Sequence, residues 1–163
     1  MAEDAIALNG LNGDHHRQFH RSVIPILMYE REDLEHLGME RHGFLAGFYC
    51  RVPAGTVDAV HFGIQTTRNQ KLKMYGYQVD DVSGRLQNDL TDGRVTHVEK
   101  QDQKLGHDCT PSIFSRSGSP VFNQQRQLVG ISFKDIGATK ALDVGYITAT
   151  LPKFCGGGDN MMP

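Results

Sequence analysis

The residues best suited to chemistry lie in one short segment, Ser115-Arg116-Ser117-Gly118-Ser119-Pro120. Serine, glycine and proline in this order are typical of a tight turn, and the apolar residues that follow indicate a strand. A serine held in such a turn can present its hydroxyl beside successive backbone N–H groups, which stabilise the oxyanion formed during acyl transfer. An ordinary turn between two strands, with no chemical role, is the alternative interpretation.

The same segment continues into Val121-Phe122-Asn123 and then Leu128-Val129-Gly130-Ile131. This order resembles the nucleophile loop of the trypsin-like serine peptidases, and most of all that of their glutamyl-endopeptidase-like branch. The resemblance implies that Ser117 is the nucleophile and that the backbone N–H groups of Ser115 and Ser117 form the oxyanion hole. Ser115 stands where the family has a glycine, and Arg116 replaces its usual Asp or Asn.

A serine hydroxyl is a weak nucleophile and needs a base within hydrogen-bond reach. The resemblance implies that His61 is this base, because residues 43–45 and 55–61 are similar to the run that precedes the family's histidine. Asp58 departs from that run, and a strand histidine with a structural role is the alternative. The acid of the triad is not identified, because no acidic residue lies between His61 and Gly76.

The resemblance also places candidate substrate-binding residues around the nucleophile, namely Pro111, Ser112, Ser132 and Phe133. Ser132 stands where the glutamyl-specific branch has a histidine. The sequence places no acidic or basic residue to select a charged substrate side chain, so it does not support a preference for glutamate.

The elements that position these residues are predicted to be β-strands. Apolar runs of four to eight residues recur between turn residues, and no long amphipathic helix is visible. Asp92-Gly93 is a strong turn signal, because glycine tolerates a positive φ angle. We expect strands over residues 43–52, 57–65, 72–79, 85–90, 95–99, 121–122 and 128–133, turns over 80–84 and 123–126, and over 143–150 a strand alone or a strand leading into a helix that ends near Phe154.

This pattern predicts an all-β protein, and the resemblance makes it a chymotrypsin-like antiparallel β-barrel. Residues 71–154 supply a largely complete second barrel with the nucleophile loop and a short C-terminal helix. Residues 22–70 are too few for a first barrel of six strands, so they are expected to be a truncated remnant. Residues 1–21 are expected to form a flexible polar arm, and residues 155–163 a flexible tail.

Composition excludes several classes of function. The chain has 163 residues and a net charge of −2, which argues against broad electrostatic binding of nucleic acid. No apolar run is long enough to cross a membrane, and no signal peptide is evident, so a cytoplasmic protein is expected. Its three cysteines are then expected to be reduced thiols, with one disulfide bridge as the alternative. No cofactor or metal site is predicted, and metal binding by the histidines of the arm, His15, His16 and His20, is a minor alternative.

The sequence therefore predicts a serine endopeptidase of the trypsin-like kind, or a degenerate relative, that hydrolyses a peptide or protein substrate. The alternative is a catalytically inactive barrel that binds a peptide or takes part in an assembly. A truncated first barrel would leave an apolar face, which a protein partner could cover.

Overall fold

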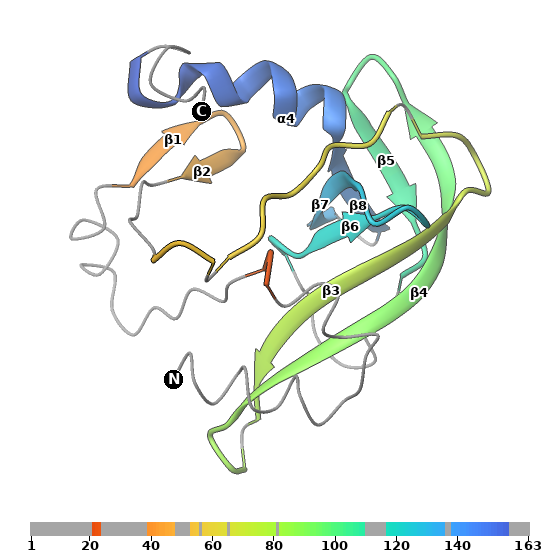
Figure 1. Cartoon of the computed structure of the whole chain (residues 1–163). Coiled ribbons are helices and arrows are strands. Elements are labelled where there is room, and N and C mark those ends of the chain that lie inside the picture. The colour runs from red at the N-terminus through yellow and green to blue at the C-terminus, as the bar shows by residue number, and fades with distance from the viewer. Residues whose placement is uncertain are drawn as a thin grey trace.

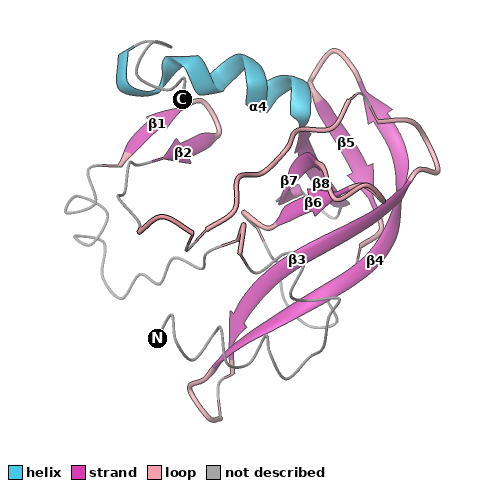
Figure 2. Ribbon diagram, viewed as in Figure 1, coloured by secondary structure: helices cyan, strands magenta, loops and turns pink. Residues whose placement is uncertain are grey.

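The computed structural model describes residues 21–23, 39–47, 53–55, 57–64, 66–80, 82–109, 117–135 and 138–156. Its centre is a closed antiparallel barrel in the order β3-β4-β5-β8-β7-β6, with a two-stranded hairpin and a C-terminal helix packed beside it (Figures 1 and 2). The barrel strands are β3 (Lys71–Val79), β4 (Leu86–Glu99), β5 (Lys104–His107), β6 (Pro120–Phe122), β7 (Leu128–Asp135) and β8 (Ala138–Asp143).

The interior of the barrel is filled by apolar side chains that alternate with polar ones. Leu72 and Met74 on β3 are buried, whereas Lys71 is exposed and Lys73 half-buried, so successive residues face opposite sides of the sheet. An interior cluster collects one or two such residues from almost every strand. Its members are Leu72, Met74, Val95, Leu105, Cys109, Val121, Val129 and Ala141.

A second apolar cluster lies on the outer face of the barrel, under the hairpin and the helix. The hairpin comprises β1 (Glu40–His42) and β2 (Leu45–Gly47). It packs on the 3-10 helix η1 (Leu151–Gly156), with the His42 and Phe154 ring centroids 4.7 Å apart. The cluster therefore joins the chain before residue 50 to the chain after residue 120. Its buried members are Leu45, Tyr75, Phe122, Leu128, Leu142, Ile147 and Phe154.

The predicted turn at Asp92-Gly93 is wrong. Both residues lie within the continuous strand β4, where Asp92 pairs with Lys73 and Gly93 with Leu72. Gly93 is needed for close packing, because a Cβ atom there would lie 2.5 Å from the backbone nitrogen of Cys109. The predicted turn at residues 80–84 is confirmed in its described part, where the Gly84 N–H donates to the Asp80 carbonyl.

Two predicted strands in the first part of the chain also need correction. The run 43–52 does not form one strand, because Gly43 (φ +60°) and Phe44 make the turn between β1 and β2. A Cβ atom at Gly43 would collide with the Tyr146 hydroxyl. The run 57–65 has a single bridge, from Phe62 to Leu128, and no strand in its described residues.

The other predicted strands agree with the structure. β3, β6 and β7 coincide with the expected runs, and a turn at residues 123–126 joins β6 to β7. Of the two alternatives for residues 143–150, the strand leading into a helix is correct. β8 ends at Asp143, which caps helix α4 (Val144–Thr150) by accepting a hydrogen bond from the Tyr146 N–H at 2.9 Å. The expected arm at 1–20 and the tail beyond 156 lie outside the described residues.

No helix in the described part of the chain is both long and apolar enough to cross a membrane.

Candidate functional site

The turn at Ser117-Gly118 is fastened to β7 by two backbone hydrogen bonds. The Gly118 N–H donates to the Ser132 carbonyl at 2.7 Å, and the Ser132 N–H donates to the Ser119 carbonyl at 2.8 Å. Gly118 has a φ of +91°, which a residue with a side chain adopts only at a cost. The local sequence therefore exposes Ser117 at the tip of a turn whose base is anchored on a barrel strand.

Ser117 and Gly118 border a mainly apolar pocket of about 230 Å³ on the outer face of the barrel. Two of the sequence-predicted substrate-binding residues, Ser132 and Phe133, border this same pocket. The other predicted site residues of this region, Pro111, Ser112 and Ser115, lie outside the described residues. Among the described residues, the pocket is lined by Phe44, Lys104, Ser117, Gly118, Ile131, Ser132, Phe133 and Leu142.

Behind the pocket, the Ser132 hydroxyl is fixed by a histidine that the sequence analysis did not select. His107 on β5 is buried, and its Nε2 atom lies 3.0 Å from the Oγ atom of Ser132. The other ring nitrogen, Nδ1, accepts the backbone N–H of Cys109 at 3.3 Å. Nε2 must therefore carry the proton and donate it to Ser132, whose own hydroxyl donates to the Lys140 carbonyl at 3.4 Å.

This arrangement holds His107 in the neutral form. Burial lowers the pKa of His107 below its usual value, although a hydrogen bond from the imidazole to the Lys140 backbone carbonyl and the charge of Asp108 act in the opposite direction. Because Nδ1 already accepts a backbone N–H, neither nitrogen is available to take a proton from Ser117. His107 is thus a positioning residue for Ser132.

Lys104 is a second residue that the sequence analysis missed, and it brings a positive charge to the pocket. Its Nζ atom lies 5.7 Å from the ring centroid of Phe44 and 5.6 Å from that of Phe133, within the range of cation–π attraction. The sequence predicts no charged residue beside the substrate-binding residues, whereas Lys104 borders the pocket that two of them line. The alternation Lys-Leu-Gly-His over residues 104–107 was the available signal, since it places Leu105 in the core and Lys104 outside.

The backbone of His61 contacts Leu128. The His61 carbonyl accepts the Leu128 N–H at 2.8 Å, and the Gly63 N–H donates to the Leu128 carbonyl at 2.8 Å. Leu128 lies four residues before Ser132 on β7, which corresponds to roughly 13 Å along a strand. The described residues contain no hydrogen bond between the two side chains, and the pairing of His61 with Ser117 stays a prediction.

Two further groups bear on chemistry. The buried thiol of Cys109 has its pKa raised to about 12, chiefly by burial and further by the charges of Asp108 and Asp92, so it is not a nucleophile at neutral pH. Among the residues that the structure describes, no three His, Cys, Asp or Glu side chains are grouped to hold a metal ion.

Comparison with models of protein families and with curated protein sequences finds no match for this chain.

Proposed function

We propose that this chain is a serine-type endopeptidase in which Ser117 attacks the peptide carbonyl and the neighbouring pocket binds a substrate side chain. One observation carries the proposal. The exposed serine of the predicted nucleophile loop and two predicted substrate-binding residues, Ser132 and Phe133, border a single pocket. The anchored turn with its positive-φ glycine is the kind of backbone that presents a hydroxyl to a bound carbonyl.

The reaction follows the usual course of acyl transfer. The Ser117 Oγ atom forms an ester bond with the carbonyl carbon, the C–N bond breaks, and the amine leaves with a proton delivered by the base. Water then hydrolyses the ester and regenerates the hydroxyl. His61 is the proposed base. The His61 residue is exposed, and its backbone carbonyl accepts the Leu128 N–H at 2.8 Å.

The pocket favours an acidic substrate side chain. Its walls are mainly apolar, and the Lys104 ammonium group brings a positive charge to them. The Ser132 hydroxyl donates to the Lys140 carbonyl and accepts from His107, so this residue adds no charge to the pocket. A side chain with an apolar stem and a carboxylate end would complement this combination of groups.

A second candidate function is peptide binding without catalysis. It is favoured by the backbone hydrogen bonds of His61 and Gly63, which are made with Leu128 rather than with the Ser117 turn. In that case the pocket would still take an acidic side chain, and Ser117 would be only a part of its rim.

Labelling with a fluorophosphonate probe tests the nucleophile. The proposal expects covalent labelling of the full chain at neutral pH, loss of labelling in Ser117→Ala, and at least about a hundredfold slower labelling in His61→Ala. Ser83→Ala, an exposed serine in another turn, is the matched control and should label like the wild type. A folded chain that is not labelled would exclude the peptidase.

Fluorescent peptides that differ only in one Glu or Gln test the pocket. We expect the glutamate peptide to be preferred at least about tenfold, through cleavage in a peptidase or through affinity in a binding module. Lys104→Met should abolish the preference, whereas Lys100→Met, at an exposed turn, should preserve it. Preference for glutamate without labelling or cleavage would establish peptide binding without catalysis. The absence of any preference would show that the pocket does not bind an acidic side chain in either candidate function.

A further inference from the structure

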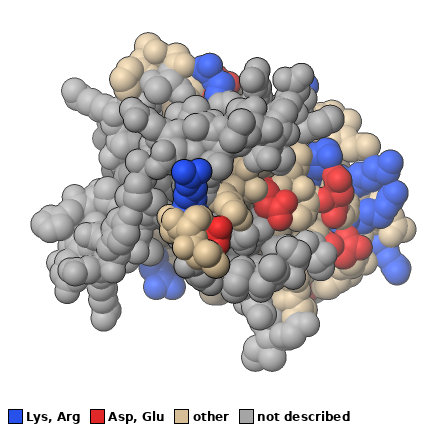
Figure 3. Space-filling model, turned by 90° about the horizontal axis from the view of Figure 1, so that it is seen from below, with Lys and Arg blue, Asp and Glu red and all other residues tan. Residues whose placement is uncertain are grey.

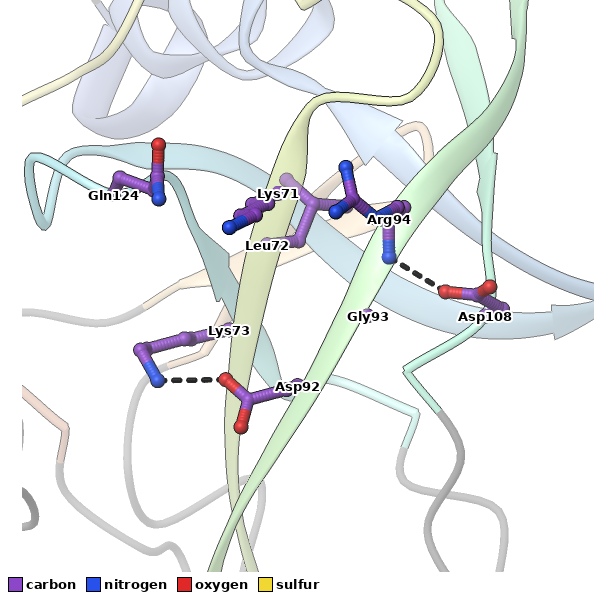
Figure 4. A pocket seen from close by; sticks show the side chains of 8 residues that line it. All are labelled: Lys71, Leu72, Lys73, Asp92, Gly93, Arg94, Asp108 and Gln124. Carbon is purple, nitrogen blue, oxygen red and sulfur yellow. Dashed lines mark hydrogen bonds and ion pairs between the residues drawn. The ribbon is translucent and has the colours of Figure 1, made fainter.

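A second, polar groove lies over β3 and β4 and shares no lining residue with the pocket at Ser117. It has a volume of about 540 Å³ and is drawn in Figure 4. Three cationic side chains and two carboxylates line it, together with the amide of Gln124 from the turn after β6. The full lining consists of Lys71, Leu72, Lys73, Asp92, Gly93, Arg94, Asp108 and Gln124.

The arrangement of charge in this groove is uneven. Lys73 and Asp92 are directly opposed on β3 and β4, and their side chains form an ion pair at 2.6 Å. Lys71 and Arg94 are also directly opposed, but both are cations. Like charges at directly opposed strand positions destabilise a sheet. Among the described residues, neither of these two side chains forms an ion pair with a carboxylate.

Arg94 is held in place by its surroundings. Its Nη1 atom donates to the Asn69 carbonyl at 2.9 Å, and Asn69 itself adopts a positive φ of 68°. Its backbone N–H donates to the Asp108 carboxylate at 2.5 Å, so this carboxylate is engaged by the backbone of β4. Four of the five guanidinium N–H donors remain for a ligand.

Besides Arg94 and Lys71, Gln124 supplies a hydrogen-bond donor to the groove. In Figure 4 the Lys71 ammonium and the Gln124 amide face each other across the groove, and the Arg94 side chain extends from β4 toward Lys71. The groove is thus lined by a guanidinium fork, an ammonium group and an amide. Such a set matches a tetrahedral anion with three outward oxygens, since the guanidinium can bind two of them and leave the third to the ammonium.

We propose that Lys71, Arg94 and Gln124 form a binding site for a single phosphate group. A nucleic acid is not the expected ligand. Asp92 and Asp108 border the same groove, and their carboxylates would repel the neighbouring phosphates of a nucleic acid. On the face seen in Figure 3, acidic side chains lie beside basic ones. The ligand class is therefore free phosphate or a small phosphomonoester.

Thermal unfolding with inorganic phosphate, at constant ionic strength set by chloride, tests the proposal. We expect millimolar phosphate to raise the Tm of the wild type by roughly 2–5 °C. Lys71→Met should raise the Tm without phosphate, because it removes the like-charge repulsion, and should abolish the phosphate-dependent rise. Arg94→Gln should also abolish that rise, and Lys100→Met, the matched control, should retain it.

Isothermal titration then distinguishes the source of the phosphate group. Tighter binding of O-phosphoserine than of inorganic phosphate, both weakened at least about tenfold by Lys71→Met, would indicate a phosphomonoester, and the reverse order would indicate free phosphate. Equal phosphate stabilisation of all variants, or none in the wild type, would overturn the proposal. So would binding of a 16-nucleotide single strand at least about a hundredfold tighter than of phosphate, because that result requires a site for several phosphates.

Discussion

The Nε2 atom of His107 donates a hydrogen bond to the Oγ atom of Ser132 at 3.0 Å, and both side chains are buried. The two residues lie on β5 and β7, which are not neighbours in the barrel but are both paired to β8. The bond therefore spans the central strand from inside the barrel, directly behind the pocket that Ser117 borders. It connects the stability of the barrel to the shape of the candidate site.

Ser132→Ala is expected to lower the free energy of unfolding by about 1–3 kcal/mol, because it removes the oxygen that lies 3.0 Å from the buried Nε2 atom of His107. Urea denaturation followed by circular dichroism measures this change. Gln101→Ala, at an exposed turn position, is the control and should change stability by less than about 0.5 kcal/mol. Equal stability of the two variants would show that the His107–Ser132 hydrogen bond contributes nothing.

Stability should also depend on pH through His107. Burial lowers its pKa in the folded chain below the value of about 6.5 in the unfolded chain, so the unfolded state binds more protons in the interval between the two values. The free energy of unfolding should therefore decrease as the pH falls from 7.5 to 5.5. Urea midpoints across this range measure the decrease, which His107→Gln should reduce. An unchanged slope in that variant would assign the effect to other groups.

Cys109 should not react with iodoacetamide in the folded protein at pH 8. The side chain is fully buried and its pKa is raised to about 12, so little thiolate is present and the reagent has no access to it. Peptide mapping by mass spectrometry distinguishes Cys109 from Cys50 and Cys155. Alkylation of Cys109 should appear only in urea, and rapid alkylation in native buffer would contradict its position inside the barrel.

Asp143→Ala should destabilise the protein by about 1 kcal/mol, because the Asp143 carboxylate accepts the Tyr146 N–H at the start of α4. Asp143→Asn keeps an oxygen that can accept the same hydrogen bond, so it should retain most of the stability. Urea denaturation of the two variants gives the comparison. A similar loss in both would mean that the negative charge matters rather than the cap.

Local patterns were sufficient wherever a strand is specified by its own residues and its adjoining turn. β3 alternates Leu72 and Met74 with Lys71 and Lys73, and the turn between β6 and β7 contains its own Asn and polar residues. The same reasoning failed at Gly93, because this glycine serves a contact with Cys109, which lies sixteen residues later in the chain. Spacing along the chain carries no information on that contact.

The sequence by itself determined the exposed turn at Ser117, because Gly118 and Pro120 fix the backbone locally, and it determined which residues border that turn on β7. Only the tertiary structure decided that Lys104 and His107 belong to the same site. Both lie on β5, and their relation to Ser132 arises from the pairing of β5 and β7 with β8. That pairing depends on closure of the barrel, which is driven by burial of side chains from distant strands rather than by any one segment.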